Sequence, residues 1–145
     1  MSSHLTQIYR FRIGTSPDEP LGTELPTLTD NALETLAEII GDEDSVILQD
    51  LVDTFLAEAL RQTQRMQRAL RDDDLAKLFL PAHSLKSSSA TFGALRLARL
   101  SEMLEASLAE KRDKQILHKL VEAIAAEYKR VSTAMRYALA GWRTK

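Results

Sequence analysis

Apolar side chains recur every three or four residues along most of the chain, from Thr29 to the C-terminus. This spacing places them on one face of an α-helix, and it does not fit the alternation of a half-buried strand. Four breaks divide the pattern into five segments, and they fall at Gly41, at residues 72–74, at Gly93 and at Lys111–Lys114. The sequence therefore predicts an all-α fold, an antiparallel four-helix bundle with a short additional N-terminal helix.

The expected helix boundaries follow from capping residues. The short N-terminal helix is expected to begin at a Thr29 or Asp30 cap and to end at Gly41. The second helix should start after the acidic sequence GDEDS and run to about Arg71. Its expected buried residues are Ile47, Leu51, Phe55, Leu56, Leu60 and Met66. Those of the last helix are Leu117, Leu120, Ile124, Tyr128, Val131, Met135 and Ala138.

Residues 1–27 differ from the rest of the chain because three prolines and two glycines interrupt any helix there. From Tyr9 to Ile13, apolar residues alternate with arginines, which is typical of an extended segment. No second strand is evident to pair with it. We expect a flexible N-terminal arm over residues 1–27 and one helical domain over residues 28–145.

The composition of the chain excludes several classes of function. A formal net charge of −2 does not suggest nucleic-acid binding through overall charge. The arginines clustered in RQTQRMQR and LRLARL leave a local basic patch possible, although solvated helix faces are the simpler interpretation. The absence of cysteine excludes disulfides and thiolate sites. No apolar run approaches the roughly 20 residues of a membrane span, and the N-terminus lacks the apolar segment of a signal peptide. The expectation is a soluble protein of the cytoplasm.

The sequence AHSLKSSSATFGA, from Ala82 to Ala94, sets a histidine and a lysine into a helical segment. His83 comes one position after a predicted buried residue, about 100° around the helix, so its imidazole is expected to reach water. Lys86 and Ser87 follow one turn later on the same flank. The predicted buried seam of this helix is Leu75, Leu78, Ala82, Leu85, Ser89 and Phe92.

These side chains suit phosphoryl transfer. Neutral imidazole is a nucleophile, and a lysine one turn away offers N–H donors to an arriving anion. Phosphoryl transfer depends mainly on positioning and charge neutralisation, and a small Ser87 leaves the flank open to a partner. From helical phase and spacing alone, an ordinary surface histidine remains the simpler interpretation.

The motif closely resembles the signature of histidine-containing phosphotransfer (HPt) domains, A-H-x-L-K-G-[SA]-[SA]-x-x-x-G-A followed by a leucine-rich helix ending in L-E. The resemblance covers about residues 28–140 and includes the pattern of helices. The chain departs from the signature at Ser87, where the family most often has glycine. The matching residues are Ala82, His83, Leu85, Lys86, Ser88, Ser89, Gly93, Ala94, Leu104 and Glu105.

The resemblance implies a phosphorelay intermediate of two-component signalling. His83 would accept a phosphoryl group from an aspartyl phosphate on one receiver domain and pass it to an aspartate on another. Lys86 and Ser87 would support the phosphoryl group, and Gly93 would allow a close helical turn beside the site. The serine in place of glycine adds a hydroxymethyl group where the receiver docks, which puts rate and partner preference in question.

The implied partners are receiver domains of hybrid histidine kinases and of response regulators, docking on an apolar rim at Phe79 and Leu80. The receiver would supply the acidic pocket and Mg²⁺, so no cofactor or metal site is expected in this chain. No nucleic acid or membrane is expected among its partners, and the chain is expected to be a monomer.

Two other interpretations stay open. The chain could be a helical adaptor that binds receiver domains without being phosphorylated, or it could dephosphorylate a receiver. The second would normally need an acid or amide to orient water, and none is evident near Lys86 or Ser87 in the sequence. A kinase is disfavoured because the chain lacks a glycine-rich phosphate cradle, and His4 and His118 have no partner at metal-ligand spacing.

Overall fold

Helices account for most of residues 24–41 and 45–143, the part of the chain that the computed structural model describes. In these two stretches there is no strand, which confirms the predicted all-α class. The elements are α2 (Ala32–Ile40), α3 (Ser45–Arg71), the 3₁₀ helix η1 (Leu75–Leu78), α4 (Phe79–Thr91), α5 (Leu95–Ala109) and α6 (Lys114–Arg143).

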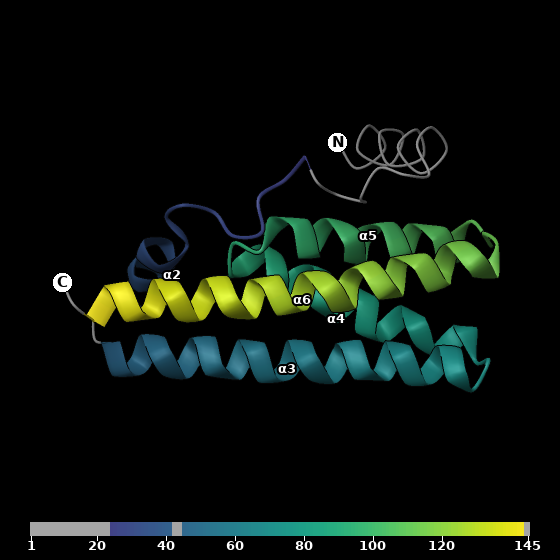
Figure 1. Cartoon of the computed structure of the whole chain (residues 1–145), viewed down its shortest axis with the longest axis horizontal. Helices are drawn as coiled ribbons and strands as arrows, with labels where there is room; N and C mark the ends of the chain where they lie inside the picture. Colours follow the sequence, from purple (N-terminus) through teal and green to yellow (C-terminus); the bar gives the residue numbers. More distant parts are fainter. Residues whose placement is uncertain (1–23, 42–44, 144–145) are drawn as a thin grey trace.

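The four longer helices lie along one another, and neighbours in the chain run in opposite directions (Figure 1). α4 packs on α3 and α5, and α6 completes the bundle by packing on the same two helices. α2 lies at one end, against α3 and α6 (Figure 1). The predicted antiparallel bundle with a short N-terminal helix is confirmed.

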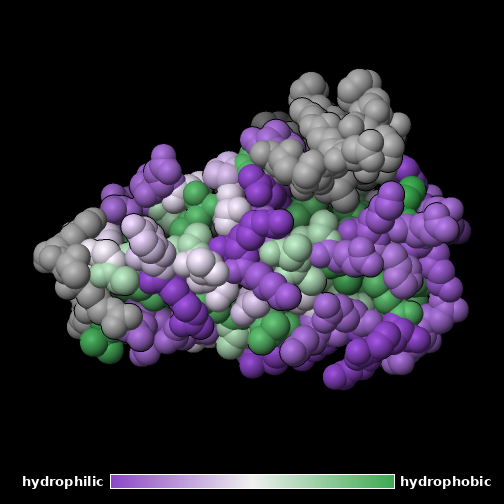
Figure 2. Space-filling view, in the orientation of Figure 1, coloured by the Kyte–Doolittle hydropathy of each residue, from purple (hydrophilic) through white to green (hydrophobic). Residues whose placement is uncertain are grey.

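The buried seams of α4 and α6 agree with the prediction. In α4 and the preceding η1, the central positions of the seam are fully buried, and Leu75 and Phe92 pack partly buried at its ends. In α6 the five aliphatic and methionine positions are buried, and Tyr128 and Ala138 pack against them. On the face shown in Figure 2, hydrophilic side chains predominate, with apolar ones in small areas between them.

The buried face of α3 is rotated from the predicted one. Phe55, Leu56 and Met66 are buried as expected, but Ile47 and Leu60 are 44% and 40% exposed. The expected face was wrong there because two alanines and a glutamine, which carry little apolar signal, belong to the true seam. That seam is Leu48, Val52, Phe55, Ala59, Gln62, Met66 and Ala69.

Two glycines with left-handed backbone end helices, as the sequence predicts. Gly41 has φ +71° after α2, and Gly93 has φ +78° between α4 and α5. A Cβ atom on Gly93 would lie 2.6 Å from Thr29 Oγ1 and 3.1 Å from the Cβ of Ala32, so this turn requires glycine. α2 is preceded by Asn31 instead of the predicted Thr29 or Asp30 cap, and the Asn31 side chain makes no capping hydrogen bond. The Thr29 backbone N–H donates to the Gly93 carbonyl at 3.0 Å, which ties the segment before α2 to the turn between α4 and α5.

The segment before α2, residues 24–30, is named here the strap. Arg96 of α5 holds it by donating from Nε to the Leu25 carbonyl at 2.8 Å, and the same guanidinium reaches the fully buried Glu127 of α6 at 3.5 Å. Most of the predicted arm, residues 1–27, lies outside the described residues. Its last four residues belong to the strap and lie along α5.

Candidate functional site

His83 lies on the outer flank of α4, where the helical phase predicts it. Its side chain is 54% exposed, although its neighbour Ala82 is fully buried. The ring stacks on Phe79 with 5.7 Å between centroids and 11° between planes. The imidazole is thus oriented by an aromatic face while about half of its surface stays in water.

Glu105 of α5 joins His83 to Lys86. Its Oε1 lies 2.8 Å from His83 Nδ1, and its Oε2 lies 2.7 Å from Lys86 Nζ. The left-handed turn at Gly93 folds α5 back along α4, which brings these residues together across 22 positions of sequence. With Glu105 ionised, Nδ1 carries the hydrogen that is donated to Oε1, and Nε2 keeps an unprotonated lone pair in neutral imidazole.

Glu105 is held in its ionised form. Burial alone would raise its pKa, but the hydrogen bonds from Lys86 and His83 and the charge of Lys86 outweigh burial, so the pKa lies below the ordinary value of 4.5. The side chain is only 16% exposed, so solvent screens these contacts weakly. The carboxylate therefore stays charged at neutral pH and keeps its orienting role.

The structure joins His83 and Lys86 through Glu105, but Ser87 and Gly93, two other predicted site residues, take no part in these contacts. Ser87 is exposed, and its hydroxyl makes no hydrogen bond within the described residues. Gly93 forms the expected tight turn, yet it lies ten residues after His83, about 15 Å along the helix, and faces Thr29 and Ala32. Its close approach is thus to the start of α2.

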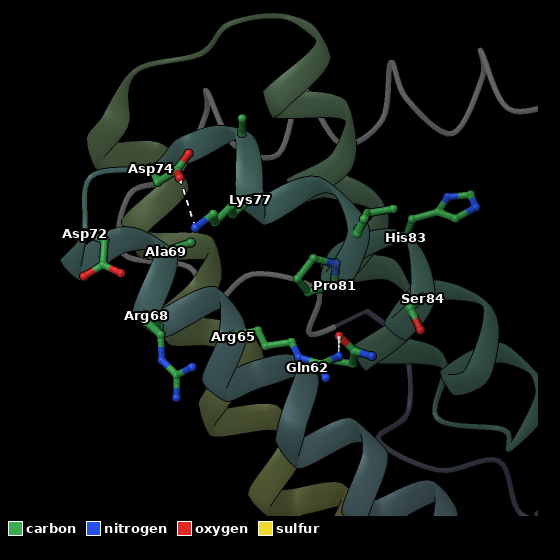
Figure 3. Close-up of a pocket in the computed structure, with 12 residues that line it drawn as sticks. Gln62, Arg65, Arg68, Ala69, Asp72, Asp74, Lys77, Pro81, His83 and Ser84 are labelled. Carbon is green, nitrogen blue, oxygen red and sulfur yellow. Dashed lines mark hydrogen bonds and ion pairs between the residues drawn. The ribbon is translucent and has the colours of Figure 1, made fainter.

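Phe79 and Leu80, the predicted docking rim, are both exposed large apolar residues, at 44% and 75%. Phe79 supports the His83 ring, and Leu80 lines a groove of about 880 Å³ between α3 and the η1–α4 segment. His83 stands at the rim of this groove with its ring pointing outward, and Arg65 and Arg68 lie on the opposite wall (Figure 3). The groove thus meets the imidazole.

The described residues hold no group of three or more histidine, cysteine, aspartate or glutamate side chains that could bind a metal ion. His118 is exposed on α6. Within the same residues, no helix is both long and apolar enough to span a membrane.

The comparison with family models decides the assignment. The Hpt domain model matches residues 50–134, more than half of the chain. The chain belongs to the Hpt domain family. This confirms the resemblance carried by the AHSLKSSSATFGA motif, and it places the chain in histidine phosphotransfer of two-component signalling.

A solved Hpt structure is similar over most of the chain. It is histidine-containing phosphotransfer protein B (HptB) from Pseudomonas aeruginosa PAO1, with 27% sequence identity and a TM-score of 0.67. The match covers 79% of this chain and 96% of HptB. Among curated protein sequences there is no match.

Within this Hpt domain, the role of Glu105 was not predicted from the sequence. Glu105 belongs to the L-E part of the signature, and the sequence around Lys86 contains no acidic residue. A signal was present, since Glu105 follows the buried Leu104 as His83 follows Ala82, and Gly93 lies close to midway between them. An antiparallel hairpin folded at Gly93 pairs these two flanks.

Proposed function

We propose that this Hpt domain carries a phosphoryl group on His83 between receiver-domain aspartates. The observation that carries the proposal is an exposed imidazole whose Nδ1 is held by a carboxylate, with an ammonium group beside it. Nε2 is then the nitrogen left to react. Such a site needs a phosphoryl donor and an acceptor, and receiver domains supply both by the family's chemistry.

Phosphoryl transfer to His83 exchanges one bond to phosphorus for another. The Nε2 lone pair attacks phosphorus of an aspartyl phosphate, an N–P bond forms, the P–O bond to the aspartate breaks and the receiver carboxylate leaves. The ring becomes positively charged while Nδ1 keeps its hydrogen, and Glu105 stabilises this charge. Lys86 lies on the same flank, where Nζ can turn from Glu105 to the phosphoryl oxygens. Return of the group to a second aspartate is the reverse reaction.

Dephosphorylation of a receiver is less well supported. Glu105 supplies an acid that the sequence alone did not reveal, but His83 and Lys86 each occupy one of its two oxygens. These contacts hold the carboxylate between the two side chains, where it orients the imidazole and the ammonium group. A carrier uses this arrangement more directly than a hydrolase does.

The test is incubation with phosphorylated receiver domains, followed by mapping of acid-labile, alkali-stable phosphate. We expect the phosphate on His83, and none in His83→Gln, whose thermal midpoint should stay within about 2 °C because the side chain is half exposed. Exposed His118→Gln is the matched control and should load normally. Receiver binding without any phosphate on His83 would identify an adaptor instead.

Two further variants separate the supporting roles. Glu105→Gln should slow loading roughly tenfold or more, because the neutral amide no longer fixes the tautomer or stabilises the charged ring. Lys86→Ala should slow transfer without preventing it, since Nζ contributes charge and no covalent step. Single-turnover rates measure both effects, and wild-type rates would remove the residue concerned from the mechanism.

A further inference from the structure

The groove between α3 and the η1–α4 segment begins at the imidazole that the proposed function uses. A typical protein interface covers about 800 Å² on each partner. A receiver domain that brings its aspartyl phosphate to Nε2 therefore also covers the groove next to His83. The side chains of the groove then decide which receivers fit.

The wall nearest His83 is apolar. Leu80 is 75% exposed, and Pro81 follows it in the lining of the groove. An exposed leucine offers apolar surface that an apolar side chain of a partner can cover. Apolar contact of this kind strengthens binding but, being non-directional, distinguishes little between one receiver domain and another.

The opposite wall, on α3, is basic. Arg68 makes no ion pair or side-chain hydrogen bond within the described residues. Arg65 is loosely held, 4.0 Å from Glu58 Oε1 and 3.3 Å from Gln62 Oε1. The guanidinium groups of both arginines are therefore available to a partner.

The acidic residues of the groove do not neutralise this wall. Asp74 forms an ion pair with Lys77 at 3.4 Å. Asp72 lies with Asp74 at the end of the groove away from His83, whereas Arg65 lies opposite Pro81 (Figure 3). Arg65 thus presents positive charge in the half of the groove next to His83. Arg68 lies on the side of Asp72 (Figure 3), but no ion pair joins these two side chains among the described residues.

We infer that Arg65 and Arg68 select the receiver domains that exchange phosphoryl groups with His83, by pairing with an acidic side chain on the receiver while Leu80 anchors its apolar surface. The inference rests on the proposed function and names the chemistry of the partner. Guanidinium groups pair with carboxylates in a two-point geometry, and charges at the edge of an interface act mainly on the rate of association.

The test uses two phosphoryl donors. Phosphoramidate is small and reaches His83 without covering the groove, whereas receiver domains charged with acetyl phosphate must dock. Arg65→Glu/Arg68→Glu should load from phosphoramidate at the wild-type rate, within twofold. For transfer from the receiver domain that phosphorylates wild-type protein fastest, the kcat/KM of this variant should fall about tenfold or more. Arg71→Glu is the matched control, because Arg71 is an exposed arginine of α3 outside the groove, and it should transfer normally.

Two more measurements sharpen the result. Arg65→Gln/Arg68→Gln should lie between wild type and the double reversal, and wild-type transfer should weaken more steeply with salt than transfer by either double variant. Changing the matching receiver carboxylate to lysine should restore transfer to the double reversal. Wild-type transfer with no loss in the double reversal, or an equal loss in Arg71→Glu, would overturn this inference alone. A wild-type protein that loads from neither donor would overturn the proposed function and this inference together.

Discussion

At the scale of single residues, Glu105 does two things at once. One oxygen orients the His83 ring, and the other holds Lys86 over the same flank. Both contacts depend on the negative charge of the carboxylate, which the lowered pKa preserves. A residue from the next helix therefore sets the orientation of the imidazole.

This charge also makes part of the stability depend on pH. The folded-state pKa of Glu105 lies below its ordinary value of 4.5, so the ionised group stabilises the fold above that value, and the contribution is lost as pH falls through the folded-state pKa. The thermal midpoint of wild type should exceed that of Glu105→Gln at pH 7, and the difference should shrink by pH 3. Melting followed by circular dichroism measures it.

The exposed Glu122 of α6 gives the control for this pH series. Glu122→Gln should change the midpoint little at either pH. A wild-type advantage over Glu105→Gln that stays constant from pH 7 to pH 3 would show that the carboxylate charge contributes nothing to the fold.

At the scale of elements, the α4–α5 hairpin depends on the turn at Gly93. Two effects act there, a positive φ angle and the close approach of Thr29. Gly41 has a similar φ angle, but a Cβ atom added to it would meet nothing within 4 Å, so it isolates the first effect. The pair of glycines thus separates backbone conformation from crowding.

Substituting each glycine by alanine tests this separation. Gly41→Ala should lower the free energy of unfolding by about 1 kcal/mol, from backbone conformation alone. Gly93→Ala should lower the free energy of unfolding by about 2–3 kcal/mol, because the Thr29 side chain or the strap backbone must also move. Urea denaturation measures both values, and equal losses would mean that the strap adjusts freely.

Helical phase predicted the elements and the exposure of His83, but it could not supply contacts between helices. In the η1–α4 segment, Leu75, Leu78 and Leu85 mark the seam, and the predicted face is correct. In α3 the seam passes through Ala59 and Gln62, so apolar residues beside it, such as Leu60, misplace the face. The contacts of Glu105 with His83 and Lys86 join two helices, so the pattern of one helix does not show them. The arginine cluster RQTQRMQR is evident in the sequence, but its position beside the His83 groove depends on how α3 packs against α4.

At the scale of the whole molecule, the strap and the bundle are joined through a buried charge. Arg96 bonds the Leu25 carbonyl and also reaches Glu127, which is 0% exposed and lies on α6. Arg130 contacts the same carboxylate oxygen at 3.1 Å from the solvent side. Three distant parts of the chain therefore meet at one guanidinium group.

Removing that guanidinium group should destabilise the whole fold. Arg96→Ala leaves Glu127 buried with only Arg130 to compensate, and we expect a loss of about 3 kcal/mol in the free energy of unfolding. Arg130→Ala, where the arginine side chain is 58% exposed, should cost less than about 1 kcal/mol. Phosphoryl loading at 25 °C should persist in both, and similar losses in the two variants would contradict a special role for Arg96.

The long-range contacts of the strap also determine which part of the molecule unfolds locally first. The Arg96–Leu25 hydrogen bond joins residues 71 positions apart, and the hydrogen bond from the Thr29 N–H to the Gly93 carbonyl is nearly as long-range. We expect such contacts to form late in folding, because closing a long loop costs entropy before the contact can stabilise the fold. Amide hydrogen exchange should therefore release Thr29 at a lower opening energy than the centre of α3, while the flank that carries His83 stays folded.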